Sequence, residues 1–181
     1  MKIVNIFAEK LYSLAYKEAH NEEYGRCEYD KLIELWTDVS YLYKFAKEND
    51  VRNIRKFVND RLRDAEQIED LLEELVEENL PLDAYFQQLH NNETGFKLLS
   101  LRKGKASKQD GLRMYAIKID DDCFLVTGGA IKMSLYMKDH RDTKEELRKL
   151  EKAKAFLKDN AVMDADSFCE FKKEIDENEY R

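Results

Sequence analysis

The chain has 181 residues, of which 43% are hydrophobic and 38% charged, with a net charge of −7 and a single proline. This composition predicts one folded α+β domain over residues 1–181 and argues against long disordered segments. No stretch approaches the roughly 20 apolar residues of a membrane-spanning helix, and neither the three cysteines nor the three histidines show the spacing of metal ligands. We therefore expect a cytoplasmic protein with no membrane partner, no disulfide framework, no metal and no cofactor.

The first half of the chain is predicted to form a strand region followed by two helices. Apolar residues alternate over 3–16, which favours a strand or a bent hairpin over a helix. Helical spacing begins at residue 30 and continues to residue 46, and Asn49 and Asp50 end this first helix. A second helix follows over 54–76, before Pro81. The helical part is therefore expected over residues 28–80.

The outer face of the second predicted helix is rich in carboxylates. These are Asp64, Glu66, Glu69, Asp70, Glu73, Glu74, Glu77 and Glu78. A solubilising surface is the simpler interpretation. The alternative is an acidic surface that shields a basic segment or binds a basic partner.

The second half of the chain is predicted to be mostly strands. The short, β-rich segments are residues 84–89, 96–101, 112–119 and 123–127. Asp120 to Asp122 join the last two as a hairpin, and the final strand continues to 134 past Gly128-Gly129, which predicts a bulge. We expect an antiparallel meander packed against helices, including a helix over 144–158 with Leu147, Leu150 and Leu157 on its buried stripe, and a short helix near the C-terminus.

Basic residues gather between positions 96 and 141, where ten stand against five acidic ones. Arg113 and Tyr115 are two residues apart, so they lie on the same side of one strand, and Lys132 lies on the return strand. A cluster of Arg, Lys and Tyr suits cleavage of an RNA phosphodiester, because cations stabilise the developing charge while Tyr or Lys transfers protons. The alternative is a solvated basic face, with Tyr115 at the edge of the core.

Residues 84 to about 158 resemble the C-terminal half of the RelE/HigB-type toxins. The similarity lies in "LRMYAIKIDDDCFLVTGGAIKMSLYMKDHRDTKEELRKLEKAKAFL" and in the preceding "GFKLLSLRKGKASKQDGLR". Like that family, the chain has an Arg-x-Tyr strand, a short turn, a hydrophobic strand, a Gly-containing strand end with a lysine, and then a helix. The resemblance implies a small antiparallel sheet packed by helices, and mRNA cleavage on the ribosome without a metal. It also implies neutralisation by a cognate antitoxin, often a helix-turn-helix protein.

The resemblance also implies roles for individual side chains. Arg113 would stabilise the phosphate, Tyr115 would orient or activate the attacking 2′-hydroxyl, and Lys132 would serve as cation or proton shuttle. The residues expected to bind RNA are Lys103, Lys105, Lys138 and Arg141. The chain differs from the family in its acidic net charge and its longer helical part. The alternative function is therefore a non-catalytic interaction protein or phage-derived protein on the same scaffold, which binds a partner through the acidic helix.

Overall fold

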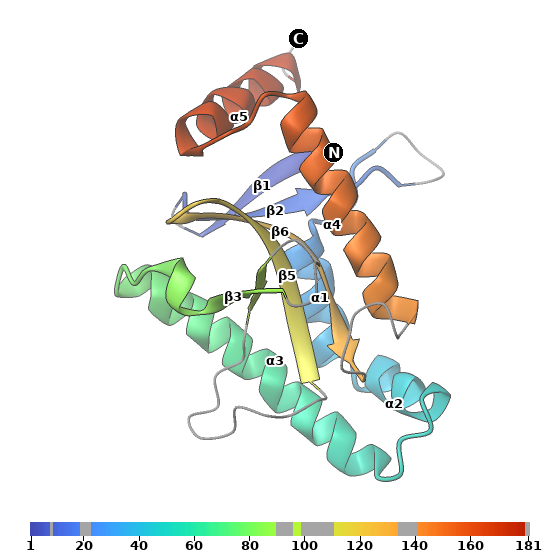
Figure 1. Cartoon of the computed structure of the whole chain (residues 1–181). Coiled ribbons are helices and arrows are strands. Elements are labelled where there is room, and N and C mark those ends of the chain that lie inside the picture. Colours follow the sequence, from blue (N-terminus) through green and yellow to red (C-terminus); the bar gives the residue numbers. More distant parts are fainter. Residues whose placement is uncertain (8, 19–22, 90–95, 99–110, 134–140, 180–181) are drawn as a thin grey trace.

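The computed structural model of the chain describes residues 1–7, 9–18, 23–89, 96–98, 111–133 and 141–179 (Figure 1). Within these residues, six strands form one sheet in the order β1-β2-β6-β5-β4-β3. The strands are β1 (Lys2–Phe7), β2 (Leu11–Ala15), β3 (Phe86–Gln88), β4 (Phe96–Leu98), β5 (Gly111–Asp120) and β6 (Cys123–Lys132). The helices are α1 (Glu28–Thr37), α2 (Val39–Glu48), α3 (Ile54–Glu77), α4 (Arg141–Asp159) and α5 (Ala165–Glu179), with a short 3-10 turn, η1 (Leu82–Ala84), before β3.

The predicted α+β arrangement is confirmed, but the sheet is mixed rather than antiparallel. Strands β4, β5 and β6 form the expected antiparallel meander, and β1 and β2 form an antiparallel hairpin. This hairpin joins the meander through a parallel pairing of β2 with β6, in which Leu11 lies opposite Phe124 and Ser13 opposite Val126. The prediction of a purely antiparallel sheet was wrong, because local sequence patterns do not specify which strand a hairpin will dock against.

The helix predicted from residue 30 to residue 46 is in fact two helices. The helix is interrupted at Asp38. Its carboxylate accepts hydrogen bonds from the backbone N–H groups of Ser40 at 2.7 Å and Tyr41 at 3.2 Å. Those bonds satisfy N–H groups that have no partner in the first turn of a helix, so Asp38 caps the start of α2. The second predicted helix is confirmed as α3. None of the helices in the described residues has the length and apolar character needed to cross a membrane.

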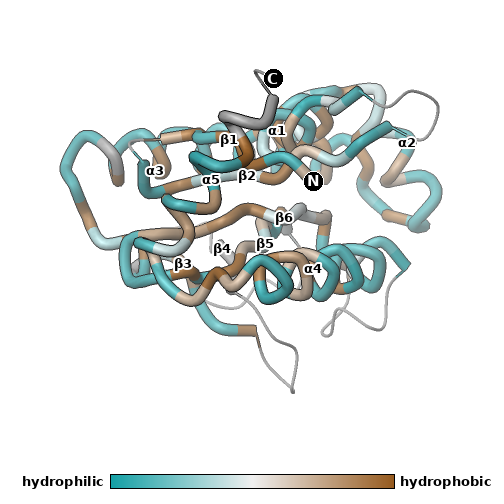
Figure 2. The backbone as a smooth tube through the Cα atoms, turned by 90° about the horizontal axis from the view of Figure 1, so that it is seen from above, coloured by the Kyte–Doolittle hydropathy of each residue, from teal (hydrophilic) through white to brown (hydrophobic). Residues whose placement is uncertain are grey.

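Helices cover both faces of the sheet. Helices α1, α2 and α3 pack on one face, in a core that includes Trp36, Leu72 and Phe124. Helices α4 and α5 pack on the other face, where Leu157 and Phe168 are buried. Figure 2 shows α1 and α4 on opposite sides of the strands. The predicted packing of the 144–158 helix on the sheet is therefore confirmed.

The Gly128-Gly129 pair follows a bulge in β6, as predicted. Tyr115 lies opposite Gly128 whereas Ala116 lies opposite Val126, so Thr127 is the extra residue. A Cβ atom on Gly128 would collide with the Glu146 side chain of α4, and one on Gly129 would lie 2.8 Å from Leu32 Cδ1 of α1. The two glycines therefore let helices from opposite faces approach the same short piece of backbone.

Candidate functional site

A pocket of about 490 Å³ lies between α1 and α4 beside the C-terminal half of β6. Strand β2 pairs with β6 only as far as Val126. Among the described residues, no strand pairs with that edge of β6 beyond this point, and Gly129, Ala130 and Ile131 line the pocket there. The remaining lining residues are Glu28, Lys31, Leu32, Leu35, Trp36, Tyr41, Arg141, Asp142, Glu145, Glu146 and Lys149.

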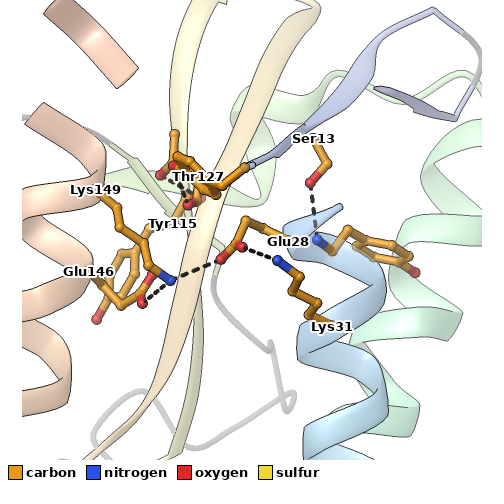
Figure 3. Close-up of polar contacts among 9 residues, drawn as sticks. Ser13, Glu28, Lys31, Tyr115, Thr127, Glu146 and Lys149 are labelled. Atoms are coloured by element: carbon orange, nitrogen blue, oxygen red, sulfur yellow. Dashed lines mark hydrogen bonds and ion pairs between the residues drawn. The ribbon is translucent and has the colours of Figure 1, made fainter. Parts of the chain in front are cut away.

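Four of these residues form a chain of ion pairs that links α1 to α4 (Figure 3). Lys149 Nζ lies 2.8 Å from Glu146 Oε1 and 3.0 Å from Glu28 Oε2. Lys31 Nζ lies 3.2 Å from Glu28 Oε1. Both carboxylates are buried, with Glu28 5% and Glu146 7% exposed, whereas the lysine side chains are about a third exposed. Buried carboxylates next to partly solvent-exposed ammonium groups are found both in catalytic sites and in structural ion pairs.

The pKa of Glu146 is raised to about 7. Burial is the main cause, because the charged carboxylate loses its hydration, and the negative charge of Glu28 adds to the effect. The ammonium of Lys149 and the backbone N–H of Gly129 act in the opposite direction. Burial lowers the pKa of Lys149, but the two carboxylates outweigh it, so that this pKa is raised overall. At neutral pH, Glu146 therefore exchanges a proton readily while Lys149 keeps its charge.

The rest of the pocket offers an apolar wall and a charged mouth. Leu32, Trp36 and Ile131 are buried, and Tyr41 is half-buried. The first residue of α4, Arg141, is exposed and lines the pocket. This arrangement places a proton-exchanging carboxyl, three cations, three further carboxylates and two aromatic rings around one pocket, a combination that can support acid–base chemistry.

Of the predicted site residues that the structure describes, Arg141 lines this pocket, whereas Arg113, Tyr115 and Lys132 are not among its lining residues. Arg113 pairs with Ala130, and Lys132 pairs with Gly111, so both side chains belong to the strand face on which α4 lies. Both are partly buried, and Arg113 Nη1 donates a hydrogen bond to its neighbour, the carbonyl oxygen of Leu112, at 2.7 Å. Arg141 is the one predicted RNA-binding residue among the described residues, and the structure places it at the pocket. Lys103, Lys105 and Lys138 lie outside the described residues.

Tyr115 belongs to the core beneath α4. It is 1% exposed and packs with Leu89, Ala130 and Leu150. Its position opposite Gly128, the residue that the Glu146 side chain covers, puts it next to the pocket but below its surface. This burial fits the interpretation of Tyr115 as a core residue, and does not fit direct contact with RNA in this conformation.

Sequence reasoning missed Glu28, Glu146 and Lys149. A signal for Glu146 was present, because the buried positions of α4 include Thr143, Glu146, Leu150, Ala153 and Leu157. A glutamate on the apolar stripe of a helix indicates a buried carboxylate. No group of three or more His, Cys, Asp or Glu side chains in the described part of the chain is placed to hold a metal ion.

Comparison of the chain with protein-family models, with curated proteins and with solved structures found no match. Any function assigned to this pocket therefore has to be argued from the residues that line it.

Proposed function

We propose that the protein is a toxin-type endoribonuclease that cleaves mRNA on the ribosome without a metal, and that the RNA binds at the pocket between α1 and α4. The observation that carries this proposal is the composition of the pocket. Cations from two helices lie beside aromatic and aliphatic side chains, at the edge of the strand in which the predicted cation Lys132 lies. The sequence resemblance over residues 84 to about 158 supplies the class of substrate.

Single-stranded RNA is usually held by stacking of its bases and by contacts to its phosphates. Arg141 is the exposed cation of the pocket lining and is placed for a phosphate contact, whereas Lys31 and Lys149 are partly exposed but already ion-paired to Glu28 and Glu146. The half-buried Tyr41 and the buried Trp36 form the aromatic part of the wall. The two lysines and the two buried carboxylates offset each other in charge, so a phosphate that binds here has to share these lysines with Glu28 and Glu146.

The mouth of the pocket also carries acidic side chains. Asp142 and Glu145 lie there beside Arg141, so the charges at the mouth are mixed. In this proposal, a cognate antitoxin, such as a helix-turn-helix protein, holds the toxin inactive.

The test is induction of the chain in a bacterium, with growth and mRNA ends followed over time. The wild-type protein should arrest growth and cut translated mRNA. Arg141→Ala and Lys132→Ala should each relieve the arrest, because one lost phosphate contact weakens binding or transition-state stabilisation. Arg148→Ala is the matched control, since Arg148 is exposed on the same helix as Arg141 and does not line the pocket. A wild-type protein that leaves growth and mRNA intact would overturn the proposal.

Tyr115→Phe tests the predicted role of the tyrosine hydroxyl. A hydroxyl that takes part in proton transfer should cost about 10²-fold in cleavage when it is removed. The burial of Tyr115 leads us to expect a much smaller effect, with the ring retained for packing.

A second candidate function is that of an interaction protein, and the exposure of the acidic face of α3 favours it. The exposed acids of that face include Glu66, Asp70, Glu73, Glu74 and Glu77. Such a surface suits a basic partner. Under this alternative, the wild-type chain is harmless, and Glu73→Lys with Glu77→Lys abolishes a complex that Arg141→Ala leaves intact.

A further inference from the structure

The side chain of Glu146 is buried against the backbone of β6, unlike that of a glutamate in an ordinary surface ion pair. Its carboxyl group lies on Gly128, where a Cβ atom would overlap Oε2, so the glycine is required for the carboxylate to lie there. Oε1 pairs with Lys149, while Oε2 is buried and makes no hydrogen bond of good geometry among the described residues, although the nearby backbone N–H of Gly129 stabilises the charged carboxyl. A buried carboxylate with so few good hydrogen bonds costs stability, which indicates a use other than holding the fold together.

The surroundings of Glu146 come from several elements. Lys149 of α4 contacts it directly, and Glu28 of α1 shares that lysine, with Lys31 on the far side of Glu28. The charge of Glu146 also acts on Tyr41 of α2 and on Tyr16, which follows β2. The pKa values of both tyrosines are raised, mainly by burial, so these phenols remain neutral near pH 7. The group in this set that changes charge near neutrality is the carboxyl of Glu146.

We infer that Glu146 is the general base of the cleavage reaction and that Lys149 is the cation that stabilises the transition state. This inference rests on the proposed endoribonuclease function and replaces Tyr115 with Glu146 as the group that activates the 2′-hydroxyl. Glu146 lines the pocket, whereas Tyr115 lies below its surface. A carboxylate is also a far better proton acceptor at neutral pH than a phenol.

The reaction is an internal transesterification. The 2′-oxygen of the RNA forms a bond to the adjacent phosphorus, and its proton passes to the Glu146 carboxylate. The bond from phosphorus to the 5′-oxygen of the next nucleotide breaks, and that oxygen takes a proton from water. Lys149 neutralises the charge that gathers on the non-bridging phosphate oxygens. The products are a 2′,3′-cyclic phosphate and a 5′-hydroxyl, and Glu146 then returns its proton to solvent.

The pH dependence of cleavage separates this role from a structural one. The wild-type rate should rise with pH through the region near 7 and then level off, as the carboxyl loses its proton. Lys149→Met should lower the rate and move the rise to higher pH, because it removes the ammonium that lowers the pKa of Glu146. A residue that only supports the fold would not move the midpoint of the profile.

The deciding experiment compares Glu146→Gln with the wild-type protein on translating ribosomes programmed with one defined mRNA. Glu146→Gln should slow cleavage about 10²- to 10⁴-fold. Glu151→Gln and Lys152→Met, exposed residues of the same helix, are the controls and should keep the wild-type rate and profile. An mRNA with a 2′-deoxy nucleotide at the mapped cleavage site should not be cut. The fold of each variant is checked by the fluorescence of Trp36, the one tryptophan of the chain.

Each outcome decides a different point. Cleavage by Glu146→Gln within a few-fold of the wild-type rate, with the same pH profile, would overturn the assignment of Glu146 and leave the proposed function standing. A wild-type protein without cleavage would overturn the proposed function itself. If Glu146→Gln does not fold, the pH–rate profile of Lys149→Met decides. A midpoint of that profile equal to the wild-type midpoint would also overturn the assignment of Glu146.

Discussion

The burial of Glu146 predicts a specific dependence of stability on pH. The pKa of this carboxyl rises from 4.5 to about 7 on folding, so between these values the folded chain binds more protons than the unfolded chain. The contribution of Glu146 to the free energy of unfolding must therefore fall as pH rises from about 4.5 to 7, and then level off. Since one pKa unit corresponds to about 1.4 kcal/mol, the contribution of Glu146 amounts to about 3 kcal/mol.

Glu146→Gln isolates this contribution, because glutamine keeps the shape of the protonated carboxyl and does not titrate. The free energy of unfolding is measured by urea titration between pH 5 and pH 8, with the buried Trp36 as the fluorescent reporter. The stability of the wild-type protein relative to Glu146→Gln should fall by about 2 to 3 kcal/mol across that range. Glu151→Gln, which removes an exposed carboxylate from the same helix, should show no such trend. An unchanged difference between pH 5 and pH 8 would refute the claim that the Glu146 carboxyl is desolvated.

Further changes test the packing around the site and the helix boundary. Gly129→Ala should destabilise the fold by about 1 to 3 kcal/mol, seen as a lower urea midpoint, because the new Cβ would lie 2.7 Å from the backbone oxygen of Arg113. Gly128→Ala should also cost stability, because Gly128 has a φ of +159° that residues with a side chain rarely adopt. The new Cβ should in addition displace Glu146 and so lower the cleavage rate, and a wild-type rate in this variant would contradict this reasoning. Asp38→Ala should cost about 1 kcal/mol, again by urea titration, because α2 loses its N-terminal hydrogen-bond acceptor, and an unaltered midpoint would count against the cap.

Local patterns were sufficient to predict most of the elements. The hairpin at Asp120–Asp122, the bulge before the glycine pair and the two longest helices, α3 and α4, follow from turn residues and from apolar spacing. The break at Asp38 also had a local signal, an N-cap residue inside a helical pattern, but continuous apolar spacing through Trp36, Val39 and Leu42 obscured it.

The candidate site was harder to predict because its parts come together only through the tertiary fold. Glu28 and Lys149 are 121 positions apart and meet around the edge of β6. Neither belongs to a motif, and each alone looks like an ordinary charged helix residue. Tyr115 is the opposite case: its position near Arg113 on one strand suggested chemistry, while alternation along β5 was equally compatible with the buried position that it occupies.

Because β2 pairs with β6, β2 lacks this neighbouring strand for part of the synthesis of the chain on the ribosome. All five residues of β2 are buried in the folded protein. Each β2 residue that pairs with β6 lies 113 positions before its partner residue in the sequence. At a translation rate of about 5 to 20 residues per second, the first hairpin waits roughly 6 to 23 seconds for the strand that covers its edge. During that interval it is an apolar strand edge without a neighbour from β6, and therefore a natural point of attachment for a chaperone on the nascent chain.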